Sequence, residues 1–302
     1  MGGVRAEQQA ARVAAIKQVA REYGATTFAD ASEGVMADLV AKRGADLEKY
    51  AGLKTEVINR LSSAPIPVKN SVAEIDKQVA ALKALKLPEN DAVISKLLGW
   101  RDALLGMEDV KLPNGETVRV AKGQPLANVE KIRAQIGQAF EDPSLAGVRD
   151  AGKKATSAIY GPLREDMGSY IKTAGDPRDY TKWSIANKRL ADMMGELDNT
   201  AFKNTLNKGQ STPEAVRRMV FSQNPSDMRL LFRNLTPEGR AKVRAAVVAD
   251  AIEKAGSDVG GVPTLSAAKF MSAIRKRGDE VGVFFDGKSD AALSGLVKVL
   301  DL

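Results

Sequence analysis

Apolar residues recur every three or four positions along most of the 302-residue chain, the spacing that places them on one face of an α-helix. Glycine and proline interrupt this pattern at intervals and mark where helices end. We therefore expect an all-α protein in which two consecutive helices, 71–87 and 89–105, pack as an antiparallel pair. The pattern predicts helices over residues 4–23, 28–61, 71–87, 89–105, 126–140, 144–174, 177–197, 237–255, 266–276 and 290–300.

Single residues refine several of these helices. Gly44 and Gly52 lie inside the second helix and are expected to break or bend it. Ser71 is followed three residues later by Glu74, which is the signature of a capping box, so Ser71 is expected to cap the helix that follows it. Pro162 is expected to kink the long helix that contains it.

One segment has the alternating pattern of a β-hairpin. Residues 110–120 place Asn114-Gly115 between alternating apolar positions, which predicts a type I′ turn. An isolated hairpin is marginally stable in water, so we expect it to pack on the helices. The glycine-containing stretch 256–261 follows no predicted strand and is not followed by Lys-Ser/Thr, so we interpret it as a flexible linker and not as a phosphate loop.

The last third of the chain has shorter helices with strong start signals. Thr212, Asn224 and Thr236 each precede a proline, the arrangement of a capping residue before the first helical position. Short capped helices are typical of a compact domain. We expect N-terminal helices over 1–64, an elongated helical body with the hairpin over 65–198, and a small basic all-α domain over 199–302.

The composition excludes several kinds of chemistry. Cysteine and histidine are both absent, which excludes disulfides, thiolate and imidazole metal ligands, and the usual general base near neutral pH. We expect no cofactor, no metal and no enzymatic activity. No stretch approaches 18 consecutive apolar residues, so the sequence predicts no conventional membrane span. Both ends resemble cuts within a longer protein, and we expect the chain to be a fragment.

The net charge of +7 is unevenly distributed. Residues 199–277 hold 14 Lys/Arg against 6 Asp/Glu, a surplus of 8 that accounts for the whole imbalance. Such a region is suited to contact nucleic acid, anionic lipid or an acidic protein, although a solvated helical surface has the same composition. No aromatic stacking pattern or sequence-reading motif accompanies it, so we expect only non-specific contact with double-stranded DNA. The candidate phosphate-contacting residues are Arg217, Arg218, Arg229, Arg233, Arg240, Lys242 and Arg244.

Few other residues are candidates for chemistry. The carboxylate pairs Glu165/Asp166 and Glu141/Asp142 are expected on exposed, charged helix faces, where nothing raises a carboxyl pKa for acid–base work. Trp100 and Trp183 lie on apolar stripes and are expected in the core. The apolar patch 281–285 is expected in the core as well, with a contact between subunits or with a membrane as the alternative.

Several segments together resemble the helical regions of internal virion (DNA ejection) proteins of tailed bacteriophages. They are IDKQVAALKAL at 75–85 with the helix that follows, the hairpin at 110–120, IRAQIG at 132–137, WSIAN at 183–187 leading to Arg189, the segment 236–247, SAAKF at 266–270 and VFF at 283–285. The resemblance covers about residues 65–300 and rests on the order of these segments.

This resemblance implies a non-enzymatic protein stored inside the virion that leaves with the genome and assembles in the host envelope or periplasm as a conduit for DNA. The implied partners are further copies of the chain, other virion proteins and double-stranded DNA, while membrane contact is left open. Two other classes remain. One is a helical scaffold or adaptor that binds other proteins, and the other is a carboxylate-based hydrolase with an unfamiliar site.

Overall fold

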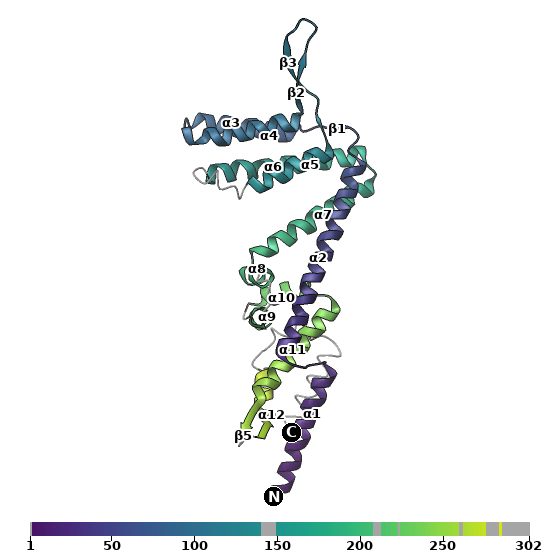
Figure 1. Cartoon of the computed structure of the whole chain (residues 1–302), viewed down its shortest axis with the longest axis vertical. Coiled ribbons are helices and arrows are strands. Elements are labelled where there is room, and N and C mark those ends of the chain that lie inside the picture. The colour runs from purple at the N-terminus through teal and green to yellow at the C-terminus, as the bar shows by residue number, and fades with distance from the viewer. Residues whose placement is uncertain are drawn as a thin grey trace. The chain divides into compact units, whose positions relative to one another are not determined.

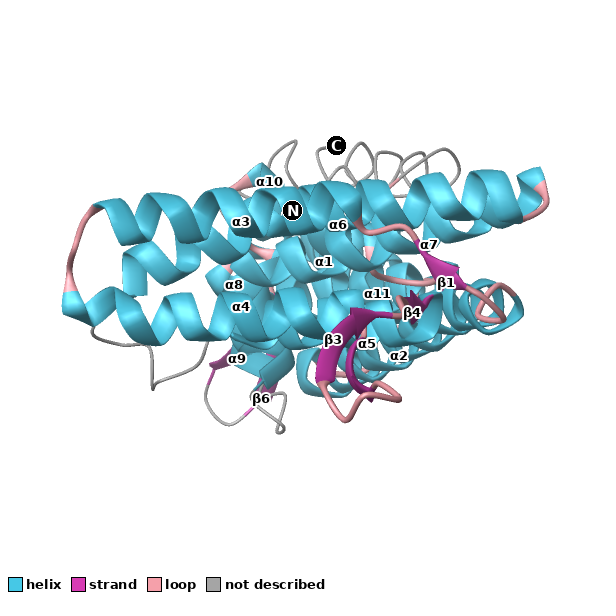
Figure 2. Ribbon diagram, turned by 90° about the horizontal axis from the view of Figure 1, so that it is seen from above, coloured by secondary structure: helices cyan, strands magenta, loops and turns pink. Residues whose placement is uncertain are grey.

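The computed structural model describes residues 2–139, 149–207, 213–222, 224–259, 262–275 and 284–285 (Figures 1 and 2). The fold is all-α with small two-stranded antiparallel sheets, which confirms the predicted class. The α-helices are α1 (Gly2–Glu22), α2 (Phe28–Arg60), α3 (Lys69–Ala84), α4 (Asp91–Leu105), α5 (Leu126–Gln138), α6 (Arg149–Ala174), α7 (Pro177–Gly195), α8 (Thr200–Asn207), α9 (Pro213–Val220), α10 (Pro225–Arg233), α11 (Pro237–Ala255) and α12 (Ala267–Arg275). The described residues also include the 3-10 helices η1 (Pro88–Asn90) and η4 (Glu196–Asp198).

Within the described ranges the strands form three antiparallel pairs. They are β1 (Pro65–Ile66) with β4 (Gln124–Pro125), β2 (Met107–Lys111) with β3 (Thr117–Ala121), and β5 (Gly256–Val259) with β6 (Val262–Leu265). Only the second pair is predicted from the sequence. The stretch interpreted as a flexible linker contributes β5 instead, so that prediction is wrong over 256–259.

The chain forms two compact units. Residues 49–190 are the central unit, and residues 1–48 with 191–302 are the terminal unit. The unit boundaries fall within α2 and α7, whereas the sequence-based division places its boundaries at 64/65 and 198/199. The two divisions differ because proline and glycine mark the ends of elements, while packing groups helices that lie far apart in the sequence.

The core of the central unit comes from the apolar faces of its helices. Side chains of α3, α4, α5 and α6 form one buried cluster, and α3 packs on both α4 and α6 (Figure 2). The predicted stripes are buried, for example Ile75 of α3, Leu97 of α4 and Ile136 of α5. Trp100 and Trp183 belong to this cluster, which confirms their predicted place in the core.

The core of the terminal unit joins the first helices to the last. Val35 and Leu39 of α2 pack with Leu231 of α10 and Val243 of α11. A second cluster brings α1 together with α11 and α12. Phe284 and Phe285 are buried in the first cluster, so the core prediction is confirmed for these two residues, while 281–283 lie outside the described residues. The predicted helix over 290–300 also lies outside them.

Two helices differ from the prediction in detail. The α2 helix runs for 33 residues through Gly44 and Gly52, so of the two expected effects, a break or a bend, the break is absent. The α3 helix begins two residues earlier than predicted, at Lys69, after an N-cap residue, Val68, whose side chain makes no capping bond. The prediction that Ser71 caps this helix is therefore wrong.

The β2–β3 hairpin turns differently from the prediction. A type I′ turn needs a positive φ at both of its central residues. Gly115 has a φ of +87°, but Asn114 has no positive φ, and the Gly115 amide donates to the Leu112 carbonyl at 2.9 Å. The loop is thus a turn over 112–115 with a left-handed glycine at its end, and the type I′ prediction is wrong.

The hairpin also does not pack on the helices along its length. Its valines Val118 and Val120 are 37% and 41% exposed, and every residue of β3 is exposed. Its base is fixed by bonds from the Lys122 amide to the Gly106 carbonyl and from the Gly123 amide to the Leu105 carbonyl. The predicted packing is confirmed only in part. Arg119 of β3 donates to Asp102 of α4 at 2.9 Å, but the strands run out from the end of α4, and Figure 1 shows them projecting beyond it.

Candidate functional site

Three helices of the terminal unit, α9, α10 and α11, position the predicted basic residues. The Asn224 side chain accepts from the Ser226 amide at 3.1 Å, and the Thr236 hydroxyl accepts from the Gly239 amide at 3.1 Å. These bonds confirm the predicted N-caps of α10 and α11. Thr212 lies outside the described residues. Because the caps fix where each helix begins, they also fix which way its arginines point.

Arg217 is held by a buried carboxylate. Its Nη2 lies 3.2 Å from Oδ1 of Asp250, which is 1% exposed, and Lys254 Nζ lies 3.0 Å from the other oxygen of the same aspartate. The guanidinium of Arg217 also lies 4.3 Å from the ring centroid of Phe28. A carboxylate as buried as Asp250 depends on its cations, so Arg217 neutralises an internal charge.

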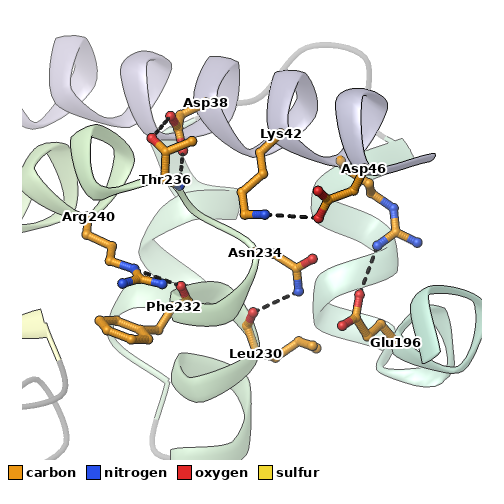
Figure 3. Close-up of polar contacts among 10 residues, drawn as sticks. Asp38, Lys42, Asp46, Glu196, Leu230, Phe232, Asn234, Thr236 and Arg240 are labelled. Atoms are coloured by element: carbon orange, nitrogen blue, oxygen red, sulfur yellow. Dashed lines mark hydrogen bonds and ion pairs between the residues drawn. The ribbon is translucent and has the colours of Figure 1, made fainter. Parts of the chain in front are cut away.

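Three more of the predicted residues contact the protein itself. Arg240 lies over the Phe232 ring at 3.7 Å from its centroid, and its Nε donates to the Phe232 carbonyl at 3.1 Å (Figure 3). Arg244 donates to the Phe284 carbonyl at 3.0 Å. The stem of Lys242 lies so close to Gly34 of α2 that a Cβ at residue 34 would come within 2.7 Å of its Cδ.

The other three predicted residues, Arg218, Arg229 and Arg233, are exposed. Over the described part of the chain they make no hydrogen bond or ion pair. Arg229 and Arg233 stand one helical turn apart on α10 and therefore share a face of that helix. The structure thus divides the seven residues into four that contact the protein and three whose guanidinium groups face solvent.

A carboxylate that sequence reasoning missed holds the start of α11. Asp38 of α2 accepts from the Thr236 amide at 2.9 Å and from the Thr236 hydroxyl (Figure 3). In a capping box the third helical residue supplies this carboxylate, but here that residue is Gly239, and a Cβ on it would collide with Asp38. Nothing in the local sequence signals the contact, because its partners are 198 residues apart.

Further polar pairs fix the surface of α2 in the same unit. Lys42 Nζ lies 2.9 Å from Asp46 Oδ2, one turn along the helix (Figure 3). Arg43 pairs with Glu196 at 3.0 Å and donates to the Met193 carbonyl at 2.6 Å. These charges stabilise the packing of α2 and leave the exposed arginines of α9 and α10 as the accessible basic groups of the predicted set.

The carboxylate pair Glu165/Asp166 differs from its prediction. Glu165 is exposed as expected, but Asp166 is only 6% exposed, so the prediction for Asp166 is wrong. Its Oδ1 accepts from Asn70 Nδ2 at 2.9 Å, and its Oδ2 accepts from the Ser71 amide at 2.8 Å and the Ser71 hydroxyl at 2.6 Å. Asp166 thus caps α3 from α6. The pair Glu141/Asp142 lies outside the described residues.

A half-buried ion cluster in the central unit keeps one carboxylate charged. Glu130 contacts Lys54 and accepts from Arg133 Nε at 2.8 Å. Burial alone would raise the pKa of Glu130, but the bonds and charges of Arg133 and Lys54 together lower it. Burial is also the main cause of the lowered pKa of Lys54. A carboxyl group that serves as a general acid needs the opposite shift.

The pKa values of two further carboxyl groups, exposed Glu56 and half-buried Glu74, are lowered as well. The pKa of Glu56 is lowered mainly by its bond from Lys182, and that of Glu74 mainly by its bond from Gln78. Among the described residues no group of three or more Asp, Glu, His or Cys side chains could hold a metal ion. No described helix is long and apolar enough to cross a membrane.

Two comparisons with known proteins give no match. No protein-family model matches the sequence, and no solved structure matches the chain. The function therefore rests on the site and on the segments of the sequence.

Proposed function

We propose that the protein is a non-enzymatic virion component of a tailed bacteriophage, an internal (ejection) protein that assists genome delivery through the host envelope by helical self-assembly. Its partners would be further copies of the chain, other virion proteins and double-stranded DNA held without sequence preference. It would reside in the virion interior and, after ejection, in the host envelope or periplasm. Support comes from the ordered segments of the sequence and from the all-helical fold.

One observation carries the DNA part of this proposal. Arg218, Arg229 and Arg233 are exposed and make no internal ion pair over the described residues, in a region that holds the basic surplus of the chain. Guanidinium groups in solvent can bind phosphate oxygens with two hydrogen bonds. The remaining four basic residues of the predicted set contact protein atoms and would have to leave them to reach a phosphate.

The proposal gives the salt dependence of DNA binding a definite size. Each phosphate neutralised on duplex DNA lowers the slope of log K against log salt by about 0.9. Three contacting arginines therefore correspond to a slope of about −2.7 per protomer, whereas seven basic contacts would give about −6. A measured slope near the first value favours the exposed arginines, and one near the second requires the internal ones as well.

The first experiment is the mass in solution by light scattering over a range of protein and salt concentrations, with and without double-stranded DNA. The proposal is supported by an assembly that dissociates at high salt and that either has the mass of a ring of several copies or forms only with DNA. A monomer that ignores both salt and DNA contradicts it.

A variant tests the DNA site itself. Replacing Arg218, Arg229 and Arg233 together with alanine is expected to weaken DNA binding and to flatten its salt dependence. The matched control replaces three exposed lysines of α3, Lys69, Lys77 and Lys83, and removes the same charge. Equal losses in the two triple variants would mean that net charge, and not these arginines, determines DNA binding.

One observation favours a second function, that of a helical scaffold or adaptor. The β2–β3 hairpin projects with both strands largely exposed, and an exposed strand edge is a common protein-binding element. Tight binding to a single protein partner without self-assembly would favour this alternative over the ejection protein.

A further inference from the structure

The β2–β3 hairpin presents two open strand edges. Over the described residues it is a two-stranded sheet on its own, so one side of each strand has no strand beside it. Unpaired strand edges readily pair with another chain, and proteins usually shorten, bend or cover them. Both strands here have five residues, paired from Met107–Ala121 to Lys111–Thr117.

The ladder of the hairpin determines which backbone groups face outward. The Leu112 amide donates to the Glu116 carbonyl and the Lys122 amide to the Gly106 carbonyl, so the even-numbered residues bond within the hairpin. In an antiparallel pair these alternate with residues whose amides and carbonyls point away. The outward groups therefore belong to 107, 109 and 111 on β2 and to 117, 119 and 121 on β3.

Each edge carries a charge at its centre, and the two charges have opposite sign. Asp109 is the middle residue of β2 and Arg119 is the middle residue of β3, with side chains 67% and 57% exposed. Within one copy, Arg119 Nε lies 3.5 Å from Asp109 Oδ1 and Arg119 Nη1 lies 2.9 Å from Oδ2 of Asp102 in α4, so these exposed groups exchange a partner when a second copy binds. Two copies could also join through the same edge, β2 to β2 or β3 to β3, with all five residues paired. This would place Asp109 opposite Asp109 or Arg119 opposite Arg119. Like charges directly opposite each other destabilise a strand pair, and opposite charges stabilise it.

The β2 edge of one copy complements the β3 edge of another copy. When β2 of one copy pairs antiparallel with β3 of the next in the register seen inside the hairpin, Asp109 stands opposite Arg119 and outward amides meet outward carbonyls. Val110 then stands opposite Val118 on the other face, which continues the exposed valine row of the hairpin. Residues 107–122 have three acidic and three basic side chains, so the copies do not repel through net charge.

We propose that the hairpin is the self-association element of this protein, joining β2 of one copy to β3 of a second copy through the Asp109–Arg119 contact. The inference rests on the self-assembly in the proposed function and assigns it to this element. Because the contact uses two different surfaces, it repeats from copy to copy and closes into a ring or continues as a filament.

The test uses the full chain and two charge variants, Asp109→Arg and Arg119→Asp. Each variant alone has equal charges at the centres of both edges, and its self-association measured by light scattering is expected to weaken about tenfold. In an equal mixture of the two, both edges of one variant are basic and both edges of the other are acidic. Unlike copies can then alternate with opposite charges facing each other, so the mixture is expected to regain the association of the original protein.

The control for the charge variants lies away from the hairpin. Lys83→Glu, at an exposed site of α3, changes the net charge by the same amount as Arg119→Asp. Its self-association is expected to equal that of the original protein.

A third variant tests the edge without changing a charge. Ala121→Pro removes an outward amide of β3, which the bonds within the hairpin do not use, and its association is expected to fall as well. Amide hydrogen exchange over 107–121 reports whether each variant keeps the hairpin. If a charge variant loses the hairpin, its weaker association says nothing about the edge, and the association of Ala121→Pro is the test of the inference.

The inference is overturned if the variants associate like the original protein, if growth stops at a dimer, or if the mixture stays as weak as its components while their hairpins remain protected. If the original protein assembles and all of the variants assemble equally well, the result contradicts this inference but not the proposed function. An original protein that stays monomeric with and without DNA removes the proposed function as well.

Discussion

The α3 helix of the central unit and the α11 helix of the terminal unit both receive a carboxylate from a distant helix at their N-terminus. Asp166 of α6 accepts from the Asn70 and Ser71 amides of α3, and Asp38 of α2 accepts from the Thr236 amide before α11. The first amides of a helix have no partner within it, and an anionic group there also favours the helix dipole.

The two helices differ in what their own sequence supplies. Thr236 caps α11 locally, through its bond from the Gly239 amide, and Asp38 then orients that cap. The residue before α3 is Val68, which makes no side-chain capping bond, so Asp166 acts without a local cap. Asp166 is also the more buried of the two carboxylates. We therefore expect the remote carboxylate to contribute more to stability at α3, where the local cap is missing, than at α11.

Replacing Asp166 should have the largest effect. Asp166→Ala removes four hydrogen bonds and leaves the buried Ser71 amide and hydroxyl without their acceptor, so the free energy of unfolding should fall by about 3 kcal/mol. Trp100 and Trp183 are the only tryptophans of the chain and both lie in the central unit, so urea unfolding followed by tryptophan fluorescence reports on it.

The neighbouring exposed residue offers the control. Glu165→Ala in the same helix should change the free energy of unfolding by no more than about 0.5 kcal/mol. Equal effects of the two changes would mean that Asp166 contributes nothing beyond an ordinary residue of α6.

Replacing Asp38 should have an intermediate effect. Asp38→Ala removes the acceptor of the Thr236 amide and hydroxyl but leaves Thr236 able to cap α11, so the expected loss is about 1.5 kcal/mol. Urea unfolding followed by far-UV circular dichroism measures it. Glu33→Ala, at an exposed site of α2, is the matched control and should lie near the original protein.

Replacing Thr236 should have the smallest effect of the three. Thr236→Ala removes one cap and should cost about 1 kcal/mol. Because Thr236 and Asp38 share a bond, the loss in the double variant should be smaller than the sum of the single losses. Additive losses in this double-mutant cycle would show that the carboxylate does not act through the cap.

The helices are predictable from the sequence because their signals are local. The spacing of apolar residues locates the stripes of α4 and α5, and a polar residue before proline locates the starts of α10 and α11. The start of α3 is not predictable in this way because its partner Asp166 stands 95 residues away from Ser71. The β5–β6 pair escapes prediction because the glycines of that stretch are equally typical of a linker.

The composition of the candidate site is predictable, but its geometry is not. Counting charges finds all seven basic residues, yet it cannot tell that Arg217 neutralises the buried Asp250 while Arg218, the next residue, faces solvent. Adjacent residues of a helix point about 100° apart, so one can contact the protein while the next faces solvent, and which one does so depends on how the helix packs. That decision depends on Phe28 and Asp250, which come from other parts of the chain.

The positions of the two remote carboxylates also set an order of events during synthesis. The ribosome makes Asp38 long before Thr236, so α11 can find its complete cap as soon as its first turn emerges. The α3 helix emerges first, and about another 95 residues must be synthesised after Ser71 before Asp166 is part of the chain. Until then its first turn has only water as a partner, and the central unit cannot reach its final form before α6 has left the ribosome.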